Sequence, residues 1–259
     1  MVLKAKLNAG KSILGTMLDL CTEPAILQLY QKCGFDFVLV DCEHAQFDNA
    51  HVFAFARMAQ ALGMGIIVRV PEVTRAKIQT ILDFGVDGIM VPGVETPEQM
   101  EEACRLAYYA PMGKRGITIG ALQDFESGFD VGERVCRYAN DNLIVIAQIE
   151  SRRGIENIDA ILSVEGVNTV LFGPMDMSND MGVPGKTRSD EVLCGIEKVL
   201  EAAGRHGVVT GNHIGDVESL EWGMDRGMRV IACSNDVGML MYRASEIATR
   251  LKSHKNFVE

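Results

Sequence analysis

The sequence predicts an α/β protein, a (β/α)₈ barrel of the TIM type that forms a single domain over residues 1–259. Eight short apolar runs, most of them rich in Val and Ile, recur along the chain, and a segment with helical spacing of apolar residues follows each run. Strands that are buried on both faces have this continuous apolar character. A length of 259 residues also lies within the range of one such barrel.

The predicted strands cover residues 12–18, 35–41, 65–70, 88–94, 143–149, 167–173, 208–214 and 229–234. The helical pattern is clearest at residues 23–34, 51–63 and 96–110, where apolar residues recur every three to four positions. Thr96 followed by Pro97 is typical of a helix start. Several predicted helices are followed by glycine, which is typical of a helix end: Gly34, Gly63, Gly85, Gly207 and Gly227.

Residues 111–142 interrupt this alternation with a long segment rich in glycine and charge. A connection of this length is typical of a functional loop or of an additional helix. Residues 131–140, VGERVCRYAN, have a helical pattern and predict that helix.

Composition and charge argue against several classes of protein. No apolar run approaches the ~20 residues that span a bilayer, and the first residues lack the apolar core and cleavage site of a signal peptide. The net charge of −10, without a basic cluster, argues against nucleic-acid binding. The seven cysteines are odd in number and form no CxxC pair, which predicts reduced thiols in a cytoplasmic protein.

Polar residues follow the predicted strands at the ends where a barrel of this kind carries its chemistry. They are Asp41, Glu43 and His44, then Arg69, Gln148, Glu150, Asp176, Asn212, His213 and the run Ser234, Asn235 and Asp236. Each has an ordinary alternative: a lone acid can cap a helix, and Arg69 can form an ion pair with Asp41 or Glu43. His213 can belong to the core or to the rim of a site, and Asp236 and Asp83 resemble caps or salt-bridge residues.

Convergence of these residues at one mouth favours a metal site. The carboxylates of Glu150 and Asp176 would repel one another there unless a cation lay between them. Two carboxylates without a neighbouring Cys or His pair favour Mg²⁺ or Mn²⁺. No lysine falls within a predicted strand, which argues against an imine-forming mechanism.

Six strings carry a resemblance to a known family: GFDFVLVDCEHAQFD, VRVP, ILDFGVDGIMVPGVET, PMGKRG, QIES and GPMDMS. In this order, over roughly residues 12–240, the chain resembles the HpcH/HpaI aldolases. These are class II, metal-dependent, pyruvate-linked aldolases on a (β/α)₈ barrel. The resemblance implies that His44 is the catalytic base with Asp41 as its carboxylate partner, and that Arg69 contacts the keto oxygen. It implies that Glu150 and Asp176 bind the divalent metal ion, which is Mg, Mn or Co.

The resemblance also assigns residues around this centre. Gln148 matches a pocket residue beside the metal, and Glu43 within the DxEH string is expected to shape the site. Asp83 matches an acid that helps to shape the site across subunits. The implied assembly is a homohexamer, a trimer of dimers, with the C-terminal helix exchanged between subunits.

Three positions depart from the family's usual strings. Met175 replaces a residue that is usually small and whose backbone N–H faces the substrate carboxylate. We expect Met175 and Asp176 to belong to the substrate pocket. Gly93 stands where methionine is usual, and Ala110 where proline is common. We expect these changes to affect the choice of aldehyde acceptor more than the reaction.

The expected activity is the reversible cleavage of a 4-hydroxy-2-oxo acid to pyruvate, or a close 2-oxo acid, and an aldehyde through an enolate at the metal. One alternative is a related acyl-CoA lyase of the malyl-CoA or citryl-CoA type. Its extended pocket would need basic residues around the mouth, and residues 111–142 offer only Lys114, Arg115, Arg134 and Arg137. Another is a non-catalytic barrel that binds a metabolite. The expected partners are therefore small molecules and further copies of the chain, with no nucleic acid and no membrane.

Overall fold

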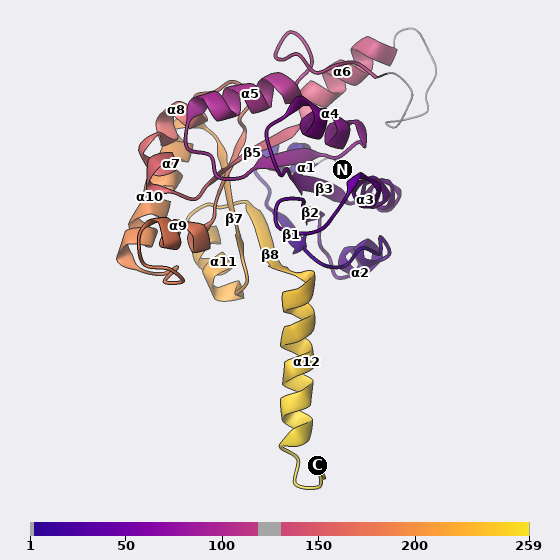
Figure 1. The fold of residues 1–259 in the computed structure, drawn as a ribbon, viewed down its shortest axis with the longest axis vertical. Helices are drawn as coiled ribbons and strands as arrows, with labels where there is room; N and C mark the ends of the chain where they lie inside the picture. The colour runs from indigo at the N-terminus through magenta and orange to yellow at the C-terminus, as the bar shows by residue number, and fades with distance from the viewer. Residues whose placement is uncertain (1–2, 119–130, 259) are drawn as a thin grey trace.

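The computed structural model describes residues 3–118 and 131–258, and it confirms the predicted barrel (Figure 1). Eight parallel strands pair in sequence order, and β8 closes onto β1. Each strand overlaps a segment that the sequence predicts. The strands are β1 (Ile13–Leu18), β2 (Phe37–Asp41), β3 (Gly65–Arg69), β4 (Gly88–Val91), β5 (Ile144–Ile149), β6 (Thr169–Phe172), β7 (Val209–Ile214) and β8 (Val230–Asn235).

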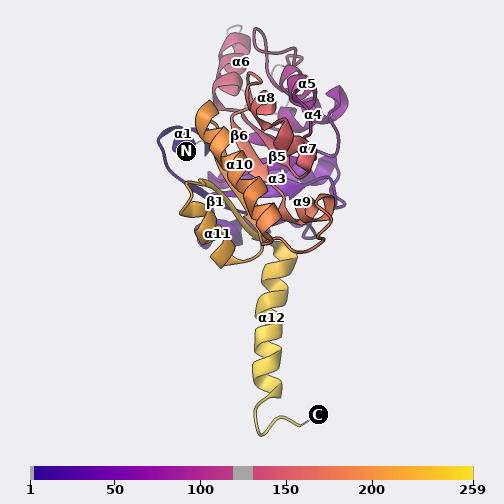
Figure 2. The same cartoon turned by 90° about the vertical axis from the view of Figure 1, so that its left-hand side faces the viewer.

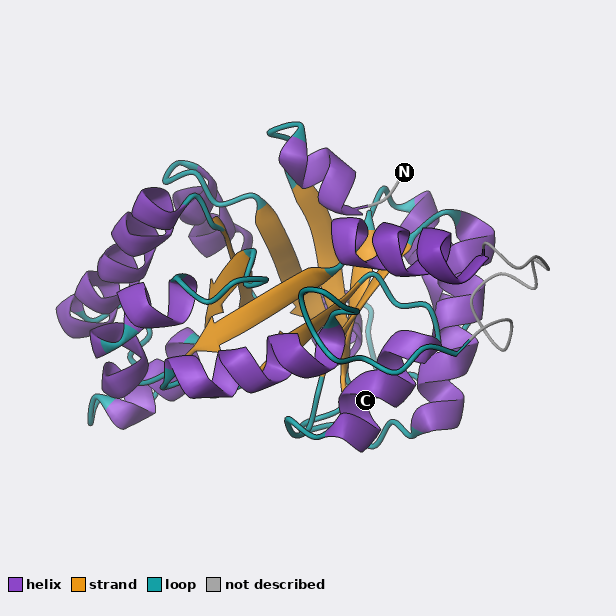
Figure 3. Cartoon of the chain, turned by 90° about the horizontal axis from the view of Figure 1, so that it is seen from above, coloured by secondary structure: helices purple, strands orange, loops and turns teal. Residues whose placement is uncertain are grey.

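Helices surround the strands, as the view from above shows (Figure 3). They are α1 (Leu3–Asn8), α2 (Ile26–Lys32), α3 (Asn49–Leu62), α4 (Arg75–Asp83), α5 (Pro97–Ala107), α6 (Val131–Asn142), α7 (Arg152–Glu156), α8 (Ile158–Leu162), α9 (Pro174–Asp180), α10 (Asp190–His206), α11 (Val217–Met224) and α12 (Asp236–Lys252). The additional helix predicted from VGERVCRYAN is confirmed as α6. Residues 119–130 of the glycine-rich segment lie outside the described residues.

The prediction of one helix after each strand is too simple in three places. A short helix, α1, precedes the first strand. The helix between β5 and β6 is divided into α7 and α8 at Asn157, whose side-chain amide donates to the carbonyl oxygen of Glu95 at 2.8 Å. After β6, the short helix α9 comes before α10. Glycine does end helices as predicted, since Gly63 and Gly207 cap α3 and α10 in the left-handed conformation.

Two apolar cores hold the barrel together. The larger lies between the strands and the outer helices, and the smaller fills the barrel interior. Leu3 and Leu7 of α1 belong to the interior core, and Leu3 packs against Gly65 at the start of β3. Helix α1 therefore closes the end of the barrel where the strands begin, and the opposite end remains as the mouth.

Helix α12 extends away from the barrel in both side views (Figure 1, Figure 2). Asp236, its first residue, is its only buried one. Several large apolar side chains on it are exposed: Leu240, Met241, Tyr242, Ile247 and Leu251. Within residues 3–118 and 131–258, we find no helix with the length and apolar character that crossing a membrane requires.

Asp87, immediately before β4, should make stability depend on pH. Its carboxylate accepts the N–H of Ile66 at 2.9 Å, and burial raises its pKa to about 6. Because the folded pKa lies above the unfolded one, near 3.9, its contribution is full below about pH 4 and is lost as the pH rises through about 6. Urea unfolding of wild type and Asp87→Asn should show wild type losing about 2–3 kcal/mol relative to the variant over that window. Parallel pH profiles would contradict this.

Candidate active site

A cavity of about 790 Å³ opens at the mouth of the barrel, where the strands end. Seven of the predicted site residues line it: Asp41, His44, Arg69, Gln148, Glu150, Met175 and Asp176. They come from β2, β3, β5 and β6 and from the segments that follow these strands. The closed barrel thus brings together side chains that are up to 135 positions apart in the sequence (from Asp41 to Asp176).

Asp41 and Arg69 form the buried ion pair of this mouth. Strands β2 and β3 are paired so that these two residues are direct neighbours. Arg69 donates from Nε and from one terminal nitrogen to the two carboxylate oxygens of Asp41, at 2.8 and 2.7 Å. Its other terminal nitrogen lies 3.2 Å from Oε2 of Glu43. Burial alone would raise the pKa of Asp41, but the hydrogen bonds and charge of Arg69 outweigh burial and hold that pKa below its ordinary value.

His44 lies at the rim, with its side chain 69% exposed. Its Nε2 is 3.8 Å from Oε2 of Glu43. The sequence pattern paired His44 with Asp41, but the structure places the Asp41 carboxylate against Arg69 and the N–H of Glu43, at 3.0 Å. Glu43 is therefore the carboxylate beside the imidazole, and it contacts Arg69 as well.

Glu150 follows β5 and is held by two donors. Its Oε1 accepts from the side-chain amide of Gln148 at 2.6 Å, and its Oε2 accepts from the N–H of Gly93 at 3.0 Å. Burial raises its pKa to about 7, and the nearby charge of Asp176 contributes in the same direction. Gly93 has a φ of 56°, a conformation that suits glycine, so the methionine usual at this position would be strained there.

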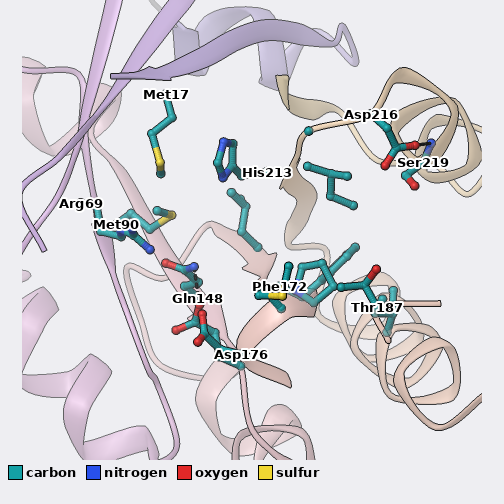
Figure 4. A pocket seen from close by; sticks show the side chains of 18 of the residues that line it. Met17, Arg69, Met90, Gln148, Phe172, Asp176, Thr187, His213, Asp216 and Ser219 are labelled. Atoms are coloured by element: carbon teal, nitrogen blue, oxygen red, sulfur yellow. Dashed lines mark hydrogen bonds between the residues drawn. The ribbon is translucent and has the colours of Figure 1, made fainter. Parts of the chain in front are cut away.

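Asp176 stands in the first turn of α9, and Figure 4 shows its carboxylate close to the side chain of Gln148. Gly173, just before α9, leaves room for the carboxylate of Glu150. A Cβ atom at Gly173 would lie 2.3 Å from Oε1 of Glu150, which is closer than any side-chain carbon can approach. The side-chain oxygen of Gln148, Oε1, is buried and has no hydrogen-bond partner in the described part of the chain.

Asp83, which was also predicted to shape the site, does not line the cavity. It is the last residue of α4, and Oδ1 accepts from a terminal nitrogen of Arg115 at 2.8 Å. Arg115 is buried and stacks over the ring of Tyr109, 4.6 Å from its centroid. Within one chain this pair anchors the segment after α5 to α4 and does not line the cavity. Its predicted role across subunits stays a prediction.

Two cavity residues deserve more weight than the sequence pattern gave them. Asp19 follows β1 and lines the cavity, and the signal that picked Asp41, an acid directly after a strand, was present for Asp19 too. Burial raises its pKa, with a further contribution from the charge of Asp41. His213, which the sequence left undecided between core and rim, lines the cavity from β7. One wall of the cavity, formed by α10, α11 and the segment before α10, was not predicted to belong to the site. It includes Thr187, Arg188, Ser219 and Trp222.

The Asp41–Arg69 pair predicts a large difference between two neighbouring acids. Asp41→Ala leaves the buried charge of Arg69 without its bidentate partner, and we expect it to lower the free energy of unfolding by about 3–5 kcal/mol. The Glu43 side chain is 27% exposed, so its contact with Arg69 is partly in solvent. Glu43→Ala should therefore lower the free energy of unfolding by about 1 kcal/mol or less. Denaturant unfolding of both variants measures the difference. Equal losses would show that the bidentate pair contributes nothing special to stability.

Comparison with known proteins identifies the family of this chain. The profile of the family described as HpcH/HpaI aldolase/citrate lyase matches residues 19–242. The hydroxypyruvate/pyruvate aldolase of Roseobacter denitrificans is 30% identical over 249 residues, which cover 96% of each chain. The 4-hydroxy-2-oxo-heptane-1,7-dioate aldolase of Escherichia coli is 30% identical over 99% of this chain and 97% of that one. The crystal structure of an HpcH/HpaI aldolase from Desulfitobacterium hafniense superposes with a TM-score of 0.96 at 39% identity, over the full length of both chains. The chain therefore belongs to the HpcH/HpaI aldolase/citrate lyase family and is an enzyme of the aldolase and lyase type.

Proposed function

We propose that this enzyme is a divalent-metal-dependent aldolase that reversibly cleaves a 4-hydroxy-2-oxo acid to pyruvate, or a close 2-oxo acid, and an aldehyde. One observation carries the proposal: Glu150 and Asp176 lie at the same cavity as the buried guanidinium of Arg69. The described residues that line the cavity include no lysine, which disfavours a Schiff base. Two relatives that are named as aldolases support the same reaction class.

The donor set fits a hard divalent cation. Glu150 and Asp176 would hold it, as Mg²⁺ is commonly held by one or two carboxylates with the remaining positions left to water and substrate. The described residues contain no group of three or more His, Cys, Asp or Glu side chains that could form a closed site. The unpartnered Oε1 of Gln148 supports a positively charged or donating neighbour at this point. When bound, Mg²⁺, Mn²⁺ or Co²⁺ would act as a Lewis acid toward the 2-oxo acid.

Arg69 is suited to hold the negative charge that develops on the keto oxygen. A guanidinium carries five N–H groups, and the contacts with Asp41 and Glu43 account for three of them. Two remain for a substrate oxygen. Because Asp41 fixes the guanidinium by two hydrogen bonds, the donors are in place before charge develops, which is the condition for strong electrostatic stabilisation.

His44 is placed to move the proton of the hydroxyl group whose carbon is released as the aldehyde. Its exposed position at the rim suits a group that meets the incoming or departing acceptor. Glu43, 3.8 Å from the imidazole, can orient the ring. The Asp41 carboxylate also accepts a backbone hydrogen bond from His44, but it would act on the imidazole only indirectly, through Arg69 and Glu43.

The acyl-CoA lyase alternative receives no support from the basic residues that it would need. Arg115, one of the four candidates, is buried and pairs with Asp83 away from the cavity. We therefore keep the small 2-oxo acid as the proposed donor.

The experiment that tests the function is exchange of the methyl protons of pyruvate in D₂O, followed by NMR. We expect exchange that EDTA abolishes and that Mg²⁺, Mn²⁺ or Co²⁺ restores, because removal of a methyl proton forms the enolate. Borohydride with pyruvate should leave the enzyme active. Exchange that persists in EDTA, or pyruvate trapped covalently on a lysine, would overturn the proposal.

Separate roles for Arg69 and His44 predict different rate patterns. Arg69→Ala should lower both proton exchange and aldol cleavage by roughly 10²–10³, the effect of removing one oxyanion donor, and Arg69→Lys should restore only part because an ammonium lacks the planar fork. His44→Ala should lower cleavage far more than exchange. Arg69→Ala that keeps normal exchange while losing cleavage would move this arginine to the acceptor side.

We also propose that the enzyme assembles as a hexamer, a trimer of dimers, in which α12 is exchanged between subunits. Leu240, Ile247 and Leu251 are spaced so that they lie on one face of α12, and they are 71%, 45% and 58% exposed in the single chain. An apolar stripe on a helix that extends from the body supports a partner of the same kind.

This assembly can be tested by charge substitution on the stripe. Leu240→Glu combined with Leu251→Glu should shift the sedimentation of the enzyme to smaller species, because burying two carboxylates opposes the contact. Thr249→Glu, on the opposite face of α12, is the matched control and should leave the size unchanged. A double variant with the wild-type sedimentation coefficient would contradict helix exchange.

A further inference from the structure

His213 carries a ring nitrogen that has no partner in the described chain. The residue stands near the end of β7, and its ring projects into the cavity (Figure 4). Nε2 lies 2.9 Å from the carbonyl oxygen of Ser234. A carbonyl oxygen can only accept, so Nε2 carries the hydrogen. Within residues 3–118 and 131–258, Nδ1 takes part in no hydrogen bond.

The protonation state of this ring follows from its surroundings. Burial lowers the pKa of His213, and the positive charge of Arg69 lowers it further, against the opposing effects of the Ser234 carbonyl and Asp41. The imidazole is therefore neutral near pH 7, with its hydrogen on Nε2. A neutral imidazole in this tautomer presents a lone pair on Nδ1, so this atom is a hydrogen-bond acceptor and cannot donate.

The backbone of Ser234 is arranged to hold His213 in place. Ser234 has a φ of 52°, and no other non-glycine residue in the described ranges has a positive φ. It lies where the pairing of β8 with β1 shifts in register between Gly15 and Met17. Its carbonyl oxygen also accepts from the hydroxyl of Thr16 at 3.2 Å. Such backbone strain costs free energy and occurs mainly at functional sites. The strained backbone at Ser234 therefore suggests that the fixed position of the His213 ring serves the function of the site.

The described residues leave Nδ1 of His213 to a ligand. The cavity lining includes apolar side chains such as Met17 and Met90, and a lining donor, Arg188, donates to Oγ of Ser219 instead, at 2.8 Å. Arg69 lies four strands away around the eight-stranded barrel, on the opposite wall, and its charge acts on His213. The reacting carbons of a substrate held by Arg69 would therefore lie between these two residues. A donor close to those carbons would satisfy Nδ1.

We propose that Nδ1 of His213 accepts a hydrogen bond from a hydroxyl group on the carbon next to a substrate carbonyl, so that the enzyme selects α-hydroxy carbonyl compounds. This inference rests on the proposed aldolase function and adds to it a specificity-determining residue. The hydroxyl can belong to the acceptor aldehyde or to the donor 2-oxo acid, because both contain a carbonyl with a carbon beside it. The recognition chemistry is the same in either case.

Two pairs of nearly isosteric compounds separate these sources. In the acceptor arm, kcat/KM is measured with pyruvate and either glycolaldehyde or propanal, which differ by a hydroxyl in place of a methyl group. In the donor arm, exchange of the C3 protons in D₂O is measured for hydroxypyruvate and 2-oxobutanoate without aldehyde. Each arm gives a ratio, hydroxylated over methylated, that does not depend on the amount of active enzyme.

The variants test whether His213 sets that ratio. His213→Leu keeps the bulk and removes the acceptor, and the ratio should fall about tenfold in the arm that uses this residue. His213→Asn can place its Oδ1 near the position of Nδ1, and should restore part of the ratio. His206→Leu, on the exposed end of α10, is the control and should keep the wild-type ratios.

The outcomes distinguish this inference from the proposed function. A fall confined to the acceptor arm assigns the hydroxyl to the aldehyde, and a fall confined to the donor arm assigns it to the 2-oxo acid. Unchanged ratios in both arms, in His213→Leu and His213→Asn alike, would overturn the inference while leaving the aldolase function in place. Wild-type enzyme that exchanges no protons on pyruvate or on either donor would overturn the proposed function, and this inference with it.

Discussion

The site depends on one constraint: a closed parallel barrel directs the ends of all eight strands toward the same mouth. Among the acids at this mouth, Asp19, Asp41, Glu43, Glu150 and Asp176 gather with one buried arginine, Arg69. Asp41 and Glu43 both form ion pairs with Arg69, and Asp19 accepts a hydrogen bond from Asn235. The negative charges of Glu150 and Asp176 repel each other. Neither carboxylate forms an ion pair with a basic side chain in the described part of the chain. The divalent cation that we propose would resolve this imbalance, and the proposed chemistry follows from it.

The segment after β8 connects this mouth to the proposed assembly. The Asp236 carboxylate accepts the N–H groups of Asp19, Leu20 and Cys21, at 3.1, 3.1 and 2.6 Å. It thereby fixes the loop that carries Asp19, while Ser234 fixes His213. Asp236 is also the first residue of α12. The residues that organise one side of the cavity therefore adjoin the helix that we propose to be exchanged, so packing of α12 on a neighbouring subunit would bear directly on this side of the cavity.

Much of the fold could be predicted from sequence because each strand carries its own local signal. Continuous Val- and Ile-rich runs mark β2, β3 and β5, and Gly63 and Gly207 mark helix ends. The division at Asn157 was not predictable, since it depends on a hydrogen bond to Glu95, 62 positions away. The same limit applies to the site. An acid after a strand shows that a carboxylate reaches the mouth, and an ion pair of Arg69 with Asp41 or Glu43 was one alternative, but strand register decides that the Asp41 carboxylate pairs with Arg69 and not with the His44 imidazole. The position of the His213 ring depends on the backbone of Ser234, which no local pattern reveals.

The most direct test of the account is calorimetric titration of the wild-type enzyme, Glu150→Gln and Asp176→Asn with Mn²⁺. Both substitutions preserve size and remove one negative charge. If these two carboxylates hold the cation, wild type binds one Mn²⁺ per subunit, and each variant loses at least about 10²-fold in affinity, since even residues that only support a metal ligand contribute 10–100-fold. Wild-type affinity in both variants would contradict the account, because the cation would then be held elsewhere or not needed at this mouth.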